Sequence, residues 1–341
     1  MSIPDEAAAQ AAQHDEQFLL MIIVPLALAG LVLAWGIGVF RRRSIAGPSR
    51  IGDGEPLGML LVVMGGAVVA LIMAQIFCMV ILASPKGATQ PSTAATTPTT
   101  HAIKLTPAQT ALSVSVPPLI AFAFMVIANK TIRPRGLSEL GLSKSPLGRG
   151  MVTGLIGSLI AVPVTFLASW ATQLLWKQFQ FEHPTEHDLL RIIRENPSPS
   201  LAVVLVASAV LIAPLAEETA FRGHLQTFIT HGLSRLKQWF TRRPTARGFD
   251  VVLPGGSIGY VALPDARPPL DPPTAAMRWV SVLMTSVLFS LVHPLWMTPP
   301  IFVLAVCLGY AYERTGNLWT TITMHAIFNT TSTVLFLMGM R

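Results

Sequence analysis

The stretch PSLAVVLVASAVLIAPLAEETAFR, residues 199–222, decides the class of fold. Its first part, residues 199–216, is apolar apart from two serines, and an acidic pair and an arginine follow directly. A helix needs ~20 mainly apolar residues to cross the hydrocarbon core of a bilayer. Residues 199–216 therefore predict a membrane-spanning helix, with two carboxylates at or beyond its end.

Seven further apolar blocks of comparable length occupy much of the chain. The eight blocks are residues 18–40, 57–83, 111–129, 151–176, 199–216, 279–296, 299–312 and 318–339. Hydrophobic residues make up 52% of the chain and charged residues only 12%, about half of the roughly 25% that soluble domains carry. We therefore predict an all-α, polytopic transmembrane bundle of about eight helices. Block 299–312 is short for a full crossing, so it predicts, with the block before it, a helical hairpin that reaches only partway.

The positions of the cations predict the topology. If the blocks alternate in direction, 17 of the 24 Lys and Arg residues share one side of the membrane. They are Arg41, Arg42, Arg43, Arg50, Lys130, Arg133, Arg135, Lys144, Arg149, Arg235, Lys237, Arg242, Arg243, Arg247, Arg267, Arg278 and Arg314. The positive-inside rule makes this side cytoplasmic and the N-terminus external, in a plasma or inner cell membrane. The net charge of +7 thus reflects topology, and we expect no nucleic-acid partner.

Composition divides the chain into three parts. Residues 1–83 are expected to form a two-helix transmembrane unit, and residues 84–110, rich in Ser, Thr and Pro, a linker. Residues 111–341 would form the core, with a cytoplasmic insertion near 240–275. Inside the insertion, the β-branched residues around Gly255-Gly256 predict a small β-hairpin.

The acidic pair Glu217-Glu218 and Arg222 form the strongest chemical signal. An ionisable side chain at mid-bilayer costs roughly 2.5–3.5 kcal/mol on insertion scales, so it needs a partner or a function. On a helix, Glu218 and Arg222 are at i and i+4 and can pair. Glu217 points about 100° away and is the acid left without the arginine. It is therefore suited to act as a general base on water.

Two later blocks each contribute a histidine, in FSLVH (289–293) and in HAIFN (325–329). His293 follows Phe289 by four residues, and His325 precedes Asn329 by four, so each pair shares a helix face. Polar groups at such positions can form helix contacts or receive a developing oxyanion. Two other histidines, His224 and His231, follow the acidic pair and are expected to be boundary residues without a catalytic role.

In this order, the segments EETAFR, FSLVH and HAIFN resemble the EExxxR, FxxxH and HxxxN/D motifs of the CAAX-protease and bacteriocin-processing family, the Rce1-like or Abi intramembrane proteases. The resemblance extends over roughly residues 130–339 and makes the first two helices an addition. It implies that Glu217 activates the hydrolytic water with help from His293, and that Arg222 holds Glu218. It also implies that His325 and Asn329 stabilise the tetrahedral intermediate. The insertion near 240–275 makes the gap between the first two motifs longer than the family pattern suggests.

The sequence leaves metal dependence open. It contains no HExxH pair to define a zinc geometry. Glu217, His293 and His325 could ligate Zn²⁺, or a glutamate and a histidine could carry out hydrolysis without metal. The two cysteines, Cys78 and Cys307, lie inside apolar blocks and suggest neither a disulfide framework nor a metal site.

These observations predict an intramembrane endopeptidase that acts on membrane-associated proteins or peptides. Two other classes remain. A catalytically silent scaffold or immunity protein would keep the fold and bind a partner, although it needs no second acid. A proton-coupled transporter would use Glu217 and His293 as a proton relay, although no internal repeat supports it.

Overall fold

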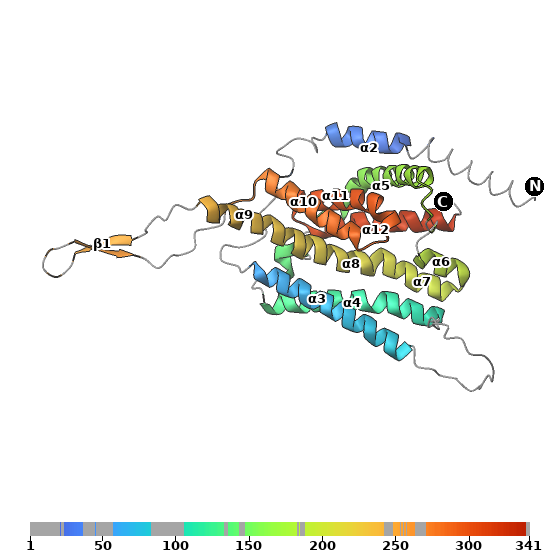
Figure 1. The fold of residues 1–341 in the computed structure, drawn as a ribbon, viewed down its shortest axis with the longest axis horizontal. Helices are drawn as coiled ribbons and strands as arrows, with labels where there is room; N and C mark the ends of the chain where they lie inside the picture. The colour runs from blue at the N-terminus through green and yellow to red at the C-terminus, as the bar shows by residue number, and fades with distance from the viewer. Residues whose placement is uncertain are drawn as a thin grey trace, which may run out of the picture.

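A computed structural model places much of the chain. It describes residues 24–36, 57–82, 106–132, 136–142, 147–182, 188–241, 248–252, 258–262 and 271–338, with the single residues 21, 45, 184, 254 and 256. The described part is a helical bundle (Figure 1), so the expected all-α class is confirmed.

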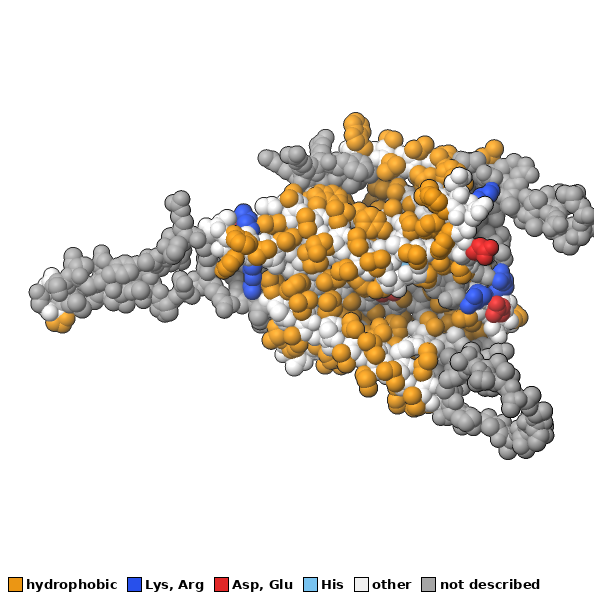
Figure 2. Space-filling view, in the orientation of Figure 1, with side chains coloured by type: hydrophobic (Ala, Val, Ile, Leu, Met, Phe, Trp, Pro, Cys, Tyr) orange, Lys and Arg blue, Asp and Glu red, His pale blue; other side chains and the backbone are white. Residues whose placement is uncertain are grey.

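The long helices of the bundle are apolar over lengths that suit a membrane. Among the described residues, five helices are long and apolar enough to cross a bilayer: Gly58–Ile81, Ala108–Ile132, Leu147–Gln178, Pro199–Thr241 and Leu295–Thr315. Apolar side chains cover the length of the visible face, and most charged side chains gather toward its two ends (Figure 2). The chain is therefore a multi-pass membrane protein. The count of eight crossings stays a prediction.

The helix that carries the acidic pair is a continuous rod from Pro199 to Thr241. It consists of α7 (Pro199–Ala207), the π-helical η3 (Ser208–Ile212), α8 (Ala213–Glu218), the π-helical η4 (Thr219–Gln226) and α9 (Thr227–Thr241). At 1.5 Å per residue, its 43 residues extend about 64 Å. The acidic pair therefore lies near the middle of the rod. The apolar block ends at 216 because the following turns contact other helices of the protein and can carry polar side chains.

Two consecutive helices form the expected hairpin. They are α10 (Ala275–Leu291) and α11 (Thr298–Thr315), joined by a turn with the short helix η5 (Leu295–Met297), and they pack on each other. Pro294 at the turn cannot continue α10, so His293 lies just beyond the end of that helix. The sequence-based interpretation placed His293 inside a longer helix, 279–296, and the structure corrects this. Whether the hairpin crosses only partway stays a prediction.

Close packing joins α5 (Leu147–Gln178) to α12 (Leu318–Leu337), the helix that carries His325 and Asn329. Glycines on α5 make this approach possible. A Cβ atom added at Gly154 would lie 2.7 Å from the Thr320 carbonyl oxygen and 2.7 Å from Thr323 Cβ. Small residues that allow helix backbones to approach are a common basis of packing inside membranes.

We expect Gly154→Leu to separate α5 from α12 and to destabilise the protein by ~1–3 kcal/mol, the usual cost of overpacking. The measurement is the thermal unfolding midpoint in detergent. Gly148→Leu is the matched control, because Gly148 is on the same helix and nothing lies within 4 Å of its Cβ position. Equal midpoints for the two variants would contradict the role of Gly154.

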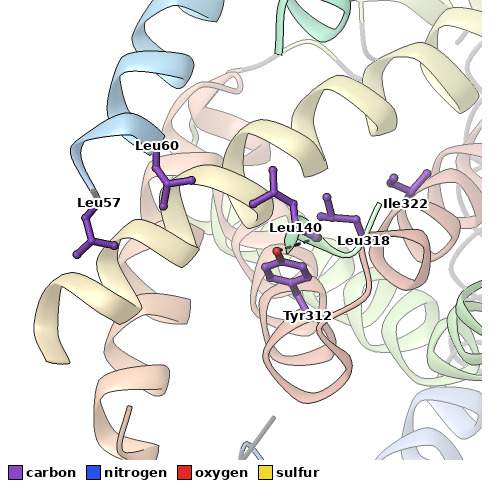
Figure 3. Close-up of a cluster of buried hydrophobic side chains, with 6 residues drawn as sticks. All are labelled: Leu57, Leu60, Leu140, Tyr312, Leu318 and Ile322. Atoms are coloured by element: carbon purple, nitrogen blue, oxygen red, sulfur yellow. Dashed lines mark hydrogen bonds between the residues drawn. The ribbon is translucent and has the colours of Figure 1, made fainter. Parts of the chain in front are cut away.

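A buried apolar cluster anchors the end of the bundle at which α12 begins. Leu140 of the 3-10 helix η2 (Gly136–Leu140) packs with Tyr312 of α11 and with Leu318 and Ile322 of α12 (Figure 3). The Tyr312 hydroxyl donates to the Leu140 carbonyl oxygen at 3.1 Å. This cluster holds the start of α12 in place, so the positions of the polar residues further along α12 follow from it.

The first two described helices lie on opposite sides of the bundle (Figure 1). Helix α2 (Val24–Gly36) packs against α5, whereas α3 (Gly58–Leu82) packs along α4 (Pro107–Ile132). Residues 84–105 of the expected linker lie outside the described residues. The division into an N-terminal unit, a linker and a core therefore stays a prediction.

Two smaller elements complete the described part. The expected β-hairpin in the insertion is present as antiparallel strands β1 (Gly248–Val252) and β2 (Ile258–Ala262), paired from Gly248–Ala262 to Val252–Ile258. Helix α6 (Asp188–Glu195) precedes the rod and buries Ile193 against the first turns of α7.

Candidate active site

Glu218 is the centre of a buried polar cluster. Its Oε1 accepts a hydrogen bond from Arg222 Nη1 at 2.9 Å and one from His325 Nδ1, also at 2.9 Å. The side chains of Glu218 and Arg222 are fully buried, and that of His325 is 6% exposed. The i, i+4 pair expected from the sequence is therefore present, and it also holds a histidine from α12.

Glu217 differs from its neighbour in exposure and in contacts. Its side chain is 32% exposed, and its Oε2 lies 3.9 Å from His325 Nε2. Because a carboxylate can only accept, Glu218 requires the hydrogen on Nδ1 of His325. The ring is thereby oriented with Nε2 toward Glu217. Two carboxylates of the same motif thus contact opposite nitrogens of one imidazole.

Phe289 is an aromatic centre beside this cluster. It is fully buried, and the Arg222 guanidinium carbon lies 4.4 Å from its ring centroid. The rings of His293 and His325 lie 4.9 and 5.9 Å from it, and Phe221 packs edge-on at 5.0 Å. A cation over an aromatic face is stabilised by the ring quadrupole. Phe289 therefore holds Arg222 and brings the two histidines to one region.

His293 is half-buried and is oriented by its own helix end. Its Nδ1 lies 2.8 Å from the Phe289 carbonyl oxygen, which can only accept, so Nδ1 carries the hydrogen and Nε2 is an acceptor. The structure gives His293 and Glu217 no hydrogen bond or ion pair with each other. The histidine beside Glu217 is His325, a contact that the motif order did not predict.

Asn329 lies one turn beyond His325 on α12 and contacts the rod. Its amide Nδ2 donates to the Ala209 carbonyl oxygen in the π-helical segment η3 at 2.7 Å. All six residues singled out from the sequence therefore lie on three neighbouring parts of the bundle. These are the rod with Glu217, Glu218 and Arg222, the hairpin turn with His293, and α12 with His325 and Asn329.

The arrangement does not form a metal site. Among the described residues, no three His, Cys, Asp or Glu side chains come together in a way that could hold a metal ion. A zinc site of Glu217, His293 and His325 would need all three donors within about 2.0–2.2 Å of one point. Because Glu217 approaches His325 but not His293, this set does not fit, and we derive no step through a metal.

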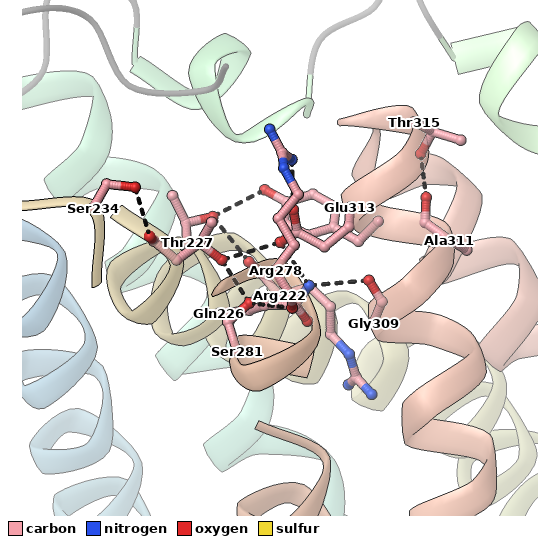
Figure 4. Close-up of polar contacts among 12 residues, drawn as sticks. Arg222, Gln226, Thr227, Ser234, Arg278, Ser281, Gly309, Ala311, Glu313 and Thr315 are labelled. Carbon is pink, nitrogen blue, oxygen red and sulfur yellow. Dashed lines mark hydrogen bonds and ion pairs between the residues drawn. The ribbon is translucent and has the colours of Figure 1, made fainter. Parts of the chain in front are cut away.

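A second buried ion pair lies further along the rod and escaped the sequence analysis. Arg278 Nη1 donates to Glu313 Oε2 at 2.7 Å, and Glu313 is fully buried (Figure 4). Gln226 Nε2 donates to Glu313 Oε1 at 2.9 Å and to the Gly309 carbonyl oxygen at 3.0 Å. Arg278 was counted among the cations of the cytoplasmic side; it is buried in an ion pair, and its side of the membrane stays a prediction. A signal for this pair was present in the sequence, because Arg278 directly precedes block 279–296 and Glu313 directly follows block 299–312, and the two blocks were predicted to form one hairpin.

Arg222 and Gln226 connect the rod to α11 at matching intervals. Arg222 Nη2 donates to the Ala305 carbonyl oxygen at 3.3 Å, and Gln226 donates to the Gly309 carbonyl oxygen. The two donors are four residues apart on the rod, and the two acceptors are four residues apart on α11, so the same faces of the two helices meet over successive turns. These contacts hold the hairpin, and with it Phe289 and His293, beside the acidic pair.

Two histidines expected at the boundary are buried. His224 is fully buried, with Nε2 2.9 Å from Asn129 Nδ2 of α4 and Nδ1 2.7 Å from the Thr219 carbonyl oxygen. His231 is 4% exposed. Both lie where the rod packs against other helices, because the rod continues well beyond the end of the apolar block.

Comparison with known proteins agrees with the family resemblance seen in the sequence. Residues 199–331 match the family model of the type II CAAX prenyl endopeptidases, described as Rce1-like. No curated protein and no solved structure matches the chain. The matched range contains the rod, the hairpin and the part of α12 that bears the polar cluster. The chain therefore carries, at residues 199–331, a domain of the Rce1-like family of type II CAAX prenyl endopeptidases.

Proposed function

We propose that this protein is an intramembrane endopeptidase that hydrolyses peptide bonds of membrane-associated proteins or peptides, with Glu217 as general base. The observation that carries this proposal is the difference between the two adjacent glutamates. Glu218 is buried and occupied by Arg222 and His325, whereas Glu217 is partly exposed beside His325. Of the two, Glu217 has the carboxylate that solvent can reach, whereas both oxygens of Glu218 are buried.

In this mechanism Glu217 takes a proton from water while the water oxygen attacks the substrate carbonyl carbon. His293 assists this activation of water through its acceptor nitrogen Nε2, since its Nδ1–H donates to the Phe289 carbonyl oxygen. The protonated Glu217 then passes the proton to the leaving amine as the C–N bond breaks. A positioned acid-base group of this kind contributes ~10²–10⁴-fold to a rate.

His325 and Asn329 stabilise the oxyanion that forms on the substrate carbonyl. Glu218 accepts the hydrogen on His325 Nδ1 and thereby orients the ring, so that its opposite nitrogen Nε2 faces the reaction site. Asn329 uses one amide hydrogen for the Ala209 carbonyl oxygen and has a second for the substrate. Donors held in advance by the protein are effective because they need no reorganisation in the transition state.

We expect Asn329→Ala to lower turnover ~10²–10³-fold if its amide serves the oxyanion. Purified protein in vesicles would be given a library of membrane peptides, and mass spectrometry would identify products and their rates. Asn196→Ala is a control, because Asn196 follows α6 outside the polar cluster and its amide donates to the Ile192 carbonyl oxygen of that helix. An Asn329→Ala variant as fast as the wild type would remove Asn329 from the mechanism.

The same assay separates the three classes of function. An endopeptidase gives products that depend on Glu217. A silent scaffold or immunity protein gives no product from the wild type but retains a bound partner. A proton-coupled transporter moves substrate across the vesicle membrane and leaves it intact. The two buried ion pairs are compatible with all three functions, but the partly exposed Glu217 favours hydrolysis.

For the topology we propose an external N-terminus and a cytoplasmic insertion, in a plasma or inner cell membrane, from the cation asymmetry. Even without the buried Arg278, that count would keep its asymmetry. With Cys78 and Cys307 replaced by alanine, Lys237→Cys should react with an impermeant thiol reagent from the cytoplasmic side and Lys104→Cys from outside. Labelling of Lys104→Cys from the cytoplasm would reverse the orientation.

A further inference from the structure

The contact between Asn329 and Ala209 depends on a break in the hydrogen-bond pattern of the rod. In a regular α-helix the Ala213 N–H would donate to the Ala209 carbonyl oxygen. Here it donates instead to the Ser208 carbonyl oxygen, five residues back, in the π-helical segment η3. The π pattern would assign the Ala209 oxygen to the N–H of residue 214.

Residue 214 is a proline, which has no N–H. Both helical donors of the Ala209 carbonyl oxygen are thus removed, one by the π pattern and one by Pro214. In a regular α-helix the proline ring would also clash with the carbonyl group four residues back. The side-chain amide of Asn329 occupies the acceptor at 2.7 Å.

We infer that Pro214 is a positioning residue for Asn329: by leaving the Ala209 carbonyl oxygen without a helical donor, it turns that oxygen into the group that orients the Asn329 amide. The inference rests on the proposed function, because it assigns Pro214 a part in presenting Asn329 to the substrate oxygen. Pro214 lies three residues before Glu217, so one short segment sets the positions of both the base and the oxyanion donor.

The orientation has a defined chemical consequence. An amide that donates one hydrogen to a fixed carbonyl oxygen cannot rotate freely, and its oxygen and nitrogen cannot exchange places. The second N–H of Asn329 makes no hydrogen bond to the described residues, and its direction is set by the first. Without the Ala209 contact, the amide could turn its acceptor oxygen toward the oxyanion, which would repel it.

The direct test is Pro214→Ala, which restores an N–H that can occupy the Ala209 carbonyl oxygen. This variant suits the fold, because alanine is the best helix former and proline the worst. We expect kcat to fall ~10²-fold, as small misplacements of catalytic groups do, with KM changed by less than about threefold and the unfolding midpoint unchanged or raised. Pro163→Ala, at a proline inside α5, is the control and should keep the wild-type kcat.

A double-mutant cycle tests the route of the effect. If Pro214 acts through Asn329, adding Pro214→Ala to Asn329→Ala should lower kcat no further. If the two substitutions lower kcat by factors that multiply in the double mutant, the inference is overturned. It is also overturned if Pro214→Ala keeps the wild-type kcat. Pro214→Ser, which also restores the N–H, should match Pro214→Ala, and it provides a second variant if the first folds poorly.

A second double-mutant cycle, measured by the unfolding midpoint, tests the inference without any catalytic readout. In the wild type, Asn329→Ala leaves the Ala209 carbonyl oxygen without its donor and should lower the unfolding midpoint. In the Pro214→Ala background the same change should lower it much less, because a backbone N–H can take the place of the amide. Equal shifts in the two backgrounds would refute the inference. If the wild type cleaves nothing while the cycle shows coupling, the proposed function fails and the contact stands.

Discussion

Replacing Glu217 by glutamine is expected to leave the protein folded and to lower turnover ~10²–10⁴-fold, the contribution of a positioned general base. Glutamine keeps the shape of the side chain but has no basic oxygen to take the proton from water. The fold should tolerate the change, because the Glu217 side chain is partly exposed and its ionic contact is the 3.9 Å approach to His325. Product formation would be measured by mass spectrometry, with the unfolding midpoint recorded in parallel.

The matched control is Glu195→Gln, which removes an exposed carboxylate at the end of α6, outside the polar cluster. It should keep the wild-type rate and midpoint. A Glu217→Gln enzyme that cleaves as fast as the wild type would show that Glu217 is not the general base. If the unfolding midpoint of Glu217→Gln falls together with its activity, Glu217 has a structural role.

Arg222→Ala is expected to reduce both folded yield and activity. The guanidinium is fully buried, pairs with Glu218, donates to the Ala305 carbonyl oxygen and lies over the Phe289 ring. Removing it leaves the Glu218 carboxylate buried without its partner, at a cost of roughly 3–5 kcal/mol. His325, which Glu218 orients, should also lose its fixed position, so turnover per folded molecule should fall too.

Expression yield, unfolding midpoint and turnover of the purified fraction measure these effects separately. Arg314→Ala is the control, because Arg314 is exposed near the end of α11. Arg222→Lys should recover part of the yield, since a lysine keeps the positive charge. It lacks the planar guanidinium group whose two terminal nitrogens reach Glu218 and the Ala305 carbonyl oxygen. Normal accumulation and full activity of Arg222→Ala would show that the ion pair stabilises nothing.

Much of the candidate site follows from local spacing. Two acids and an arginine inside apolar sequence must be paired or functional because the bilayer does not solvate them. An i, i+4 interval places Glu218 against Arg222 in any α-helical turn, and the structure has this pair. The short blocks around Pro294 predict a hairpin because proline ends the first helix, and α10 and α11 form it.

Contacts between helices could not be predicted in the same way. The spacing within HAIFN shows that His325 and Asn329 share a face, but not which group each one meets on another helix. His325 lies between the two glutamates, and Asn329 reaches the Ala209 carbonyl oxygen. Each contact depends on the register of α12 against the rod, which glycines on α5 and the cluster around Tyr312 determine.

The sequence by itself determined the membrane class, the order of the three motifs and the charged group of Glu217, Glu218 and Arg222. These features depend on composition and on intervals within single helices, where one turn every 3.6 residues relates position to direction. Only the tertiary structure decided that His325 rather than His293 lies beside Glu217, that His224 and Arg278 are buried, and that Asn329 contacts Ala209. The physical reason is that packing between helices depends on shape along their whole length and on breaks such as the π segment, and no local interval specifies these.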